Sequence, residues 1–177
     1  MSNVSWTQFA RLVGAPVTVT LRGRVASADE PAERVCFAPP DLWRVTDDDG
    51  HLRYLANDDG HYTYPPGETR ACFQPRRKGF WHSGGTVCSA LIHPRDLDDA
   101  DDDFTRPLGA VEEIAFLGRV AWRVLLAPPA RKPQPVWQVL DVASGVTLAY
   151  QAPDGQPLVA FTALETDVAL PDGTFAA

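Results

Sequence analysis

The chain has 177 residues, of which 45% are hydrophobic, and its 16 Lys+Arg against 23 Asp+Glu give a formal net charge of −7. That length fits one domain over residues 1–177 and lets a sizeable core form without metals or disulfides. The negative charge argues against a general nucleic-acid binder, because phosphate neutralisation needs a basic surface. The 13 glycines and 16 prolines are typical of many turns between strands. We therefore expect a soluble, strand-rich domain.

The N-terminal stretch predicts a helix over residues 3–13. Asn3 or Ser5 can cap it, an apolar stripe follows, and Gly14 and Pro16 end it. The start of the chain lacks the basic and apolar regions of a signal peptide, which predicts a cytoplasmic protein. No apolar stretch approaches the roughly 20 residues that span a bilayer. We therefore expect no membrane segment.

After this helix, apolar residues recur at every second position. From Val17 to Val25 apolar residues alternate with threonines and arginines, which is typical of a half-buried strand. Short strands follow between turn signals, among them two Asp-Gly steps at Gly50 and Gly60. These further strands are expected at residues 34–38, 42–46, 51–56, 61–64 and 69–73.

The middle of the chain interrupts this rhythm. Residues 74–85 predict a long loop, and residues 86–103 predict one or two short helices followed by an acidic run. About ten strands in meander order, with few helices, predict an antiparallel sheet that curls or a barrel left partly open. The later strands are expected at residues 110–117, 119–127, 135–142, 146–151 and 157–162, with residue 170 as an alternative end of the last strand.

Three stretches together carry a family resemblance. They are residues 40–45 with Gly50, Tyr54 and residues 61–64; residues 118–126; and residues 136–148 with the closing residues 170–175. In order and spacing they resemble the LolA/LppX/RseB-type lipoprotein-carrier superfamily. The resemblance implies a mainly β (α+β) fold: a strongly curved antiparallel sheet that forms an unclosed half-barrel, with an N-terminal helix and a short helical or loop lid.

A concave sheet face must be filled by side chains, a helix or a ligand. The strands over residues 119–127 and 136–142 are apolar on both faces, which favours coverage on both faces. The leading hypothesis is therefore a noncatalytic protein that binds an apolar or lipid-like small molecule in the half-barrel. The candidate ligand-binding residues are its aromatic side chains Trp43, Tyr54, Tyr64, Trp81, Trp122 and Trp137.

Two other function classes stay open. A cofactor-free enzyme acting on a small hydrophobic metabolite would draw acid–base and anion-holding groups from the segment around residues 76–95 and from nearby tyrosines. A protein-interaction module would use edge strands left by incomplete closure. The candidate catalytic residues are His82, His93, Arg95, Tyr62 and Tyr64.

No motif predicts a metal or a cofactor. The chain lacks a phosphate-cradling glycine loop, a dinucleotide fingerprint and a Gly-x-Ser-x-Gly elbow. The four histidines show no metal-ligand spacing, and the acidic run over residues 96–103 has Phe104 where a calcium loop needs glycine. Cys36, Cys72 and Cys88 form no Cys-x-x-Cys pair and predict free thiols.

Overall fold

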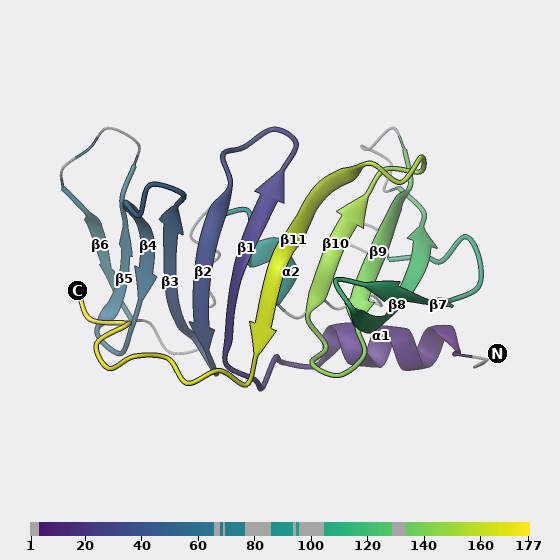
Figure 1. Cartoon of the computed structure of the whole chain (residues 1–177), viewed down its shortest axis with the longest axis horizontal. Helices are drawn as coiled ribbons and strands as arrows, with labels where there is room; N and C mark the ends of the chain where they lie inside the picture. The colour runs from purple at the N-terminus through teal and green to yellow at the C-terminus, as the bar shows by residue number, and fades with distance from the viewer. Residues whose placement is uncertain are drawn as a thin grey trace.

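The computed structural model describes residues 4–65, 68, 70–76, 86–93, 95, 105–128 and 134–177. Eleven strands form one antiparallel sheet in the order β6-β5-β4-β3-β2-β1-β11-β10-β9-β8-β7 (Figure 1). The sheet ends at β6 and β7 and does not close into a barrel, which confirms the mainly β, unclosed half-barrel. The strands are β1 (Leu21–Ser27), β2 (Glu33–Ala38), β3 (Leu42–Asp47), β4 (Leu52–Ala56), β5 (Gly60–Thr63), β6 (Cys72–Pro75), β7 (Glu112–Phe116), β8 (Arg119–Leu126), β9 (Val136–Asp141), β10 (Thr147–Gln151) and β11 (Pro157–Thr166).

The first helix, α1 (Trp6–Gly14), begins where the sequence places its cap. Ser5 is the N-cap: its Oγ accepts from the Gln8 N–H at 3.2 Å, and the Gln8 side chain accepts from the Ser5 N–H at 2.9 Å. This capping box satisfies two amide groups that the first turn leaves unbonded. Phe9 and Val13 are buried, so the predicted apolar stripe faces the sheet.

The order of the strands differs from a simple meander. Strands β1–β6 and β7–β11 each follow one another in sequence, but β1 also pairs with β11, and this pairing joins the two runs. The first strand begins at Leu21 rather than at Val17, although Val17 is buried in the core. The sixth strand occupies Cys72–Pro75 rather than residues 69–73. Local periodicity carries no information on which distant strand supplies a partner.

The second helix, α2 (Ser89–Ile92), falls within the segment predicted to hold short helices. Figure 1 shows it behind β1 and β11. The acidic run over residues 96–103 lies outside the described residues, as does most of the loop predicted over residues 74–85. Among the described residues, no helix combines the length and apolar character needed to cross a membrane.

The sheet has two distinct faces. The helix-side face is the one that packs against α1 and α2; Leu21, Val35, Trp43 and Tyr54 lie on it together with the α2 residues Leu91 and Ile92. Toward the other end, α1 packs on the same face through Phe9 and Val13, against Val124, Leu126, Val136 and Leu140. The opposite face, here the outer face, carries alternating polar residues on β1–β3 and a smaller apolar cluster around Ala121, Val139 and Ala160.

The C-terminal segment after β11 runs along one end of the sheet toward β5 and β6 (Figure 1). Its carbonyl groups accept two hydrogen bonds: Arg44 Nη1 of β3 donates to Thr174 O at 3.3 Å, and Asn57 Nδ2, just after β4, donates to Phe175 O at 3.2 Å. The tail is therefore attached to the first half of the sheet, although it follows the last strand.

A glycine permits the close approach of β1 and β11. The sheet bulges between Arg24 and Val25, and there the Phe161 ring lies over Gly23. A Cβ at position 23 would lie 2.6 Å from Phe161 Cε1 and 2.9 Å from the Ala163 carbonyl oxygen. Such distances are shorter than any van der Waals contact, so a side chain at position 23 requires the two strands to move.

Gly23→Ala is expected to lower the free energy of unfolding by about 1–3 kcal/mol, the usual cost of overpacking a well-filled core. Gly109→Ala is the matched control, because a Cβ there meets nothing within 4 Å. Urea unfolding of both variants measures the difference. Equal stabilities would show that the β1–β11 approach tolerates a side chain.

Candidate functional site

The predicted aromatic residues Trp43 and Tyr54 lie on the helix-side face beneath α2. Each is 1% exposed. The Phe37 ring meets the Trp43 ring edge-on with centroids 4.9 Å apart, and the His93 ring lies 5.1 Å from Trp43. A void of about 10 Å³ lies between this cluster, Ile92 and the residues before β1. That space holds about one water molecule, so the side chains around Trp43 are closely packed.

Titratable groups surround the aromatic cluster. Burial raises the pKa of Asp41, and the nearby positive charges of Arg76 and His93 oppose that rise. Arg76 Nη2 lies 3.4 Å from Asp41 Oδ2. Burial also raises the pKa of Tyr54, and the charge of Asp41 adds to the effect. Sequence reasoning missed Asp41, because a single aspartate at a strand start carries no distinguishing pattern.

Several buried polar atoms on this side of the sheet lack hydrogen bonds within the described part of the chain. Among them are Trp43 Nε1, Trp122 Nε1 and Gln138 Oε1. The Asp41 carboxyl interacts with the Trp43 indole, at a geometry short of a hydrogen bond. Gln138 is fully buried and uses its Nε2 to donate to Thr147 Oγ1 at 3.0 Å. Buried polar groups are normally bonded, so these atoms need a physical explanation.

The other predicted ligand-binding residues are dispersed. Trp122 is half-buried beside the cluster under α1. Trp137 is half-buried with the Arg123 guanidinium 4.7 Å from its ring centroid, and Tyr64 is half-buried just after β5. Trp81 lies outside the described residues. The structure therefore brings together Trp43 and Tyr54, and places Trp122 and Trp137 in the other half of the sheet.

The described residues of the predicted enzyme set also contact different partners. His93 lies against Trp43, whereas Arg95 Nη1 donates to Tyr150 Oη at 2.9 Å. Tyr62 packs against Phe73 with ring centroids 4.7 Å apart and the ring planes inclined by 37°. Tyr64 is half-buried, and His82 lies outside the described residues.

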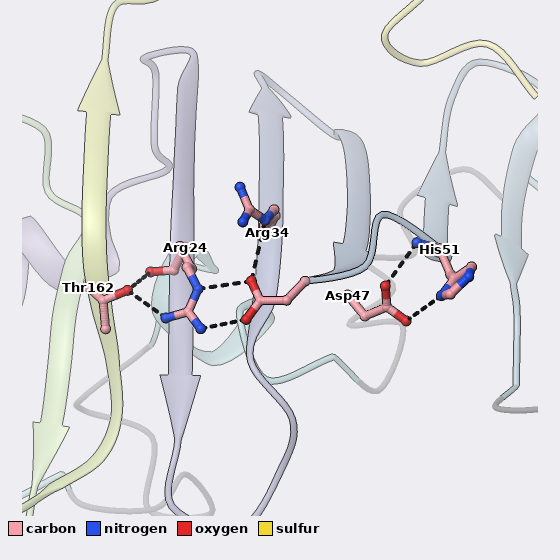
Figure 2. A network of polar contacts seen from close by, with 6 residues as sticks. Arg24, Arg34, Asp47, His51 and Thr162 are labelled. Atoms are coloured by element: carbon pink, nitrogen blue, oxygen red, sulfur yellow. Dashed lines mark hydrogen bonds and ion pairs between the residues drawn. The ribbon is translucent and has the colours of Figure 1, made fainter.

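One group of possible metal ligands occurs among the described residues. The ligand atoms of Asp47, Asp49 and His51 lie within 4.8 Å of one another, at the turn between β3 and β4. His51 Nδ1 already pairs with Asp47 Oδ2 at 3.1 Å, as Figure 2 shows. Asp49 and His51 are exposed, and ordinary turn hydrogen bonding accounts for this arrangement.

The outer face holds a feature that sequence reasoning missed. A groove of about 330 Å³ is lined by Arg22 and Arg24 of β1, Arg34 of β2 and Arg44 of β3, together with Glu165 of β11. Figure 2 shows Arg24 and Arg34 converging on a carboxylate between them, that of Asp48. In the sequence, this groove corresponds to arginines at alternating positions of the strands. Their convergence depends on strand register, which no single strand reveals.

Comparisons with known proteins agree on the fold. No family model and no curated protein sequence matches the chain. A MucA/MucB complex structure from Pseudomonas aeruginosa superposes with a TM-score of 0.58 at 16% identity, covering 97% of this chain and 59% of that chain. The chain thus spans well under two thirds of that relative.

A MucB structure gives a TM-score of 0.50 at 18% identity, covering 97% of this chain and 62% of that one. The chain has a LolA/RseB-like fold. A conserved protein of Thermus thermophilus described as uncharacterized also superposes on it, with a TM-score of 0.55 at 12% identity over 97% of this chain and 92% of that one. This fold, an open sheet with helices on one face, is the one that the sequence resemblance predicted.

Burial of the Cys88 thiol, at the N-cap of α2, predicts a fall in stability at alkaline pH. Burial raises the pKa of its thiol well above the ordinary value of 9.0. Since the folded state favours the neutral thiol, its contribution is complete below pH 9.0 and is lost as the pH rises from there toward the folded-state pKa. Tyr54 adds to the loss above its ordinary value of 10.0.

Cys88→Ala is expected to reduce this alkaline loss, measured as the change in unfolding free energy between neutral and alkaline pH. Its absolute stability will also fall, because Cys88 is fully buried. Cys72→Ala, at an exposed position, is the control. An unchanged pH slope in Cys88→Ala would contradict the assignment to this thiol.

Proposed function

We propose that the chain is a noncatalytic binding protein that holds an apolar or lipid-like molecule between the helix-side face of the sheet and its helices. The observation that carries the proposal is the combination of aromatic walls with an unbonded polar atom, Trp43 Nε1, beneath a short helical cover. Ligand pockets typically combine apolar walls with a few polar groups that orient the ligand. The LolA/RseB-like fold supports the proposal at the level of architecture.

Helix α2, which covers Trp43, is held in place by few contacts. Helix α2 has four residues and no side-chain N-cap hydrogen bond. Its N-terminal side is held by Glu33 Oε2, which accepts from the Cys88 N–H at 3.2 Å, and by Ser89 Oγ, which donates to the Thr86 carbonyl at 2.7 Å. Leu91 and Ile92 supply the remaining apolar contact. Because so short a helix has little stability of its own, an apolar ligand can replace its contacts with the sheet.

The unbonded atoms indicate an amphipathic ligand rather than a pure hydrocarbon. An unbonded buried polar group costs about 1–3 kcal/mol, and a ligand atom that bonds it recovers that free energy. Trp43 offers an N–H donor under α2, whereas Trp122 and Gln138 lie in the other half of the sheet. A molecule with an apolar body and a hydroxyl or carbonyl group can bond the Trp43 N–H, which a hydrocarbon cannot.

Native mass spectrometry before and after organic-solvent extraction tests the proposal, together with a Nile red fluorescence titration of the extracted protein. Nile red is an uncharged apolar probe with a carbonyl acceptor, so surface charge does not attract it. We expect saturable Nile red binding, and a co-purifying mass that extraction removes. A bare chain mass before extraction, with no saturable Nile red signal, would refute the proposal.

Trp43→Phe tests the location of the site. Loss of the indole N–H is expected to weaken Nile red binding by about 5-fold, the equivalent of one ordinary hydrogen bond. Trp137→Phe is the matched control, since that side chain lies against Arg123 in the other half of the sheet. Equal affinities in the two variants would place the probe elsewhere.

A protein partner is the second candidate, favoured by the MucA/MucB complex among the structural neighbours. The open sheet leaves β6 and β7 as edges. All four residues of β6 are exposed, including Phe73 at 48%. Exposed edge strands can pair with an added strand from a partner. If β6 binds a partner, affinity-tagged protein purified from its native host should retain a stoichiometric partner, and Phe73→Lys should weaken that binding. Recovery of the chain alone would count against this candidate.

A further inference from the structure

The outer face of β1, β2 and β3 carries an ordered set of arginines. In one row across the strands Arg22 lies opposite Cys36, and Cys36 lies opposite Arg44. In the next row, Arg24 lies directly opposite Arg34, which in turn lies opposite Thr46. Four guanidinium groups therefore share one small surface of a protein whose net charge is −7.

Like charges directly opposite each other destabilise a sheet. The structure offsets the Arg24–Arg34 pair with Asp48, which accepts from Arg24 Nε at 2.9 Å and lies 3.3 Å from Arg34 Nε (Figure 2). The hydrogen bonds from Arg24 hold the pKa of Asp48 below its ordinary value. Glu165 pairs with Arg22 Nη2 at 2.9 Å. Two carboxylates thus face four guanidinium groups, which leaves an excess of two positive charges.

Each of three arginines in the groove contacts its partner through a single nitrogen. Arg22 reaches Glu165 through Nη2, Arg34 reaches Asp48 through Nε, and Arg44 reaches the Thr174 carbonyl through Nη1. A guanidinium group has five N–H donors in a planar fork. These contacts therefore leave donors on three strands for an additional acceptor.

Small side chains make this surface hollow. Cys36 and Ala163 lie among the arginines, and the resulting groove has a volume of about 330 Å³. Burial raises the pKa of the half-buried Cys36 thiol, and the charges of Arg22 and Arg44, which lie opposite it on β1 and β3, oppose that rise. The volume lies at the lower end of the range for small-molecule sites, about 300–1,000 Å³.

We propose that this groove binds a phosphate group, carried either by a soluble phosphate compound or by an anionic lipid headgroup. A phosphate brings up to two negative charges and several strong acceptor oxygens, which match the excess charge and the remaining arginine donors. The net charge of −7 of the whole chain disfavours a long polyanion such as nucleic acid. The inference is independent of the proposed apolar site, which lies on the opposite face of the sheet.

Cys36 provides a local reporter for the test. In a Cys72→Ser variant, the uncharged reagent iodoacetamide should modify the half-buried Cys36, while Cys88 is fully buried and protected. We expect inorganic phosphate to slow Cys36 alkylation saturably, and sodium chloride at the same ionic strength to leave the rate unchanged. A phosphate effect that chloride reproduces, or no effect of phosphate and none of the vesicles described below, would overturn the proposal.

Arginine variants identify the groove as the source of protection. Arg34→Gln and Arg44→Gln are each expected to raise the phosphate concentration needed for half-protection by about 10-fold, as expected for loss of a charge-assisted hydrogen bond. Arg11→Gln, at an exposed position on α1, is the charge-matched control. If the three variants respond alike, the effect is one of net charge and the proposal fails. Circular dichroism checks that each variant is folded.

Vesicles separate the two sources of phosphate. Phosphatidylcholine vesicles containing phosphatidic acid should protect Cys36 if the groove takes a lipid headgroup, whereas pure phosphatidylcholine vesicles should not. Protection by inorganic phosphate alone assigns a soluble ligand, and protection by phosphatidic acid vesicles assigns a lipid. The Nile red titration in the same variants should be unchanged, because the two sites lie on opposite faces. Failure of one site is thus distinguishable from failure of the other.

Discussion

The pairing of β1 with β11 is the interaction on which the rest of the structure depends. It joins a run of strands from the first part of the chain to a run from the last part, and it makes one sheet of the two. Gly23 permits it, because the Phe161 ring occupies the place where a side chain would lie. Val25 and Phe161 are paired across this seam and are both buried in the main core. Without this pairing, each half would have one more exposed edge and only part of the core.

The two faces of the sheet at the β1–β11 pairing differ chemically. On the helix-side face, burial excludes water, so the unbonded atoms of Trp43 and Gln138 are energetically costly, and that of Trp43 is the basis of the proposed apolar site. On the outer face, Arg22 and Arg24 flank Gly23 and remain accessible to solvent. Water screens those charges, so the repulsion between the guanidinium groups is tolerable, and the proposed phosphate would bind in addition to Asp48 and Glu165. A single strand thus contributes to both proposed sites because its side chains alternate between faces.

The open form of the sheet also has consequences for partners. Closure would remove the edges at β6 and β7, whereas the LolA/RseB-like arrangement keeps them. The C-terminal tail occupies one end of the sheet, through Arg44 and Asn57, and links the groove to the last residues of the chain. Arg44 is therefore held from outside its own strand, which fixes one wall of the arginine groove.

Local features of the structure could be predicted from the sequence alone. The Ser5 cap, the period-two strands and the turn glycine at Gly50, whose φ is +87°, follow from short-range stereochemistry, and the motif order supported the half-barrel. Tertiary structure alone decided the β1–β11 pairing, the burial of Trp43 under α2 and the convergence of Arg24, Arg34 and Asp48. These depend on register between strands distant in sequence, where a shift of one residue would move each side chain to the opposite face. Periodicity along one strand reports which residues share a face, but not which residues they meet across the sheet.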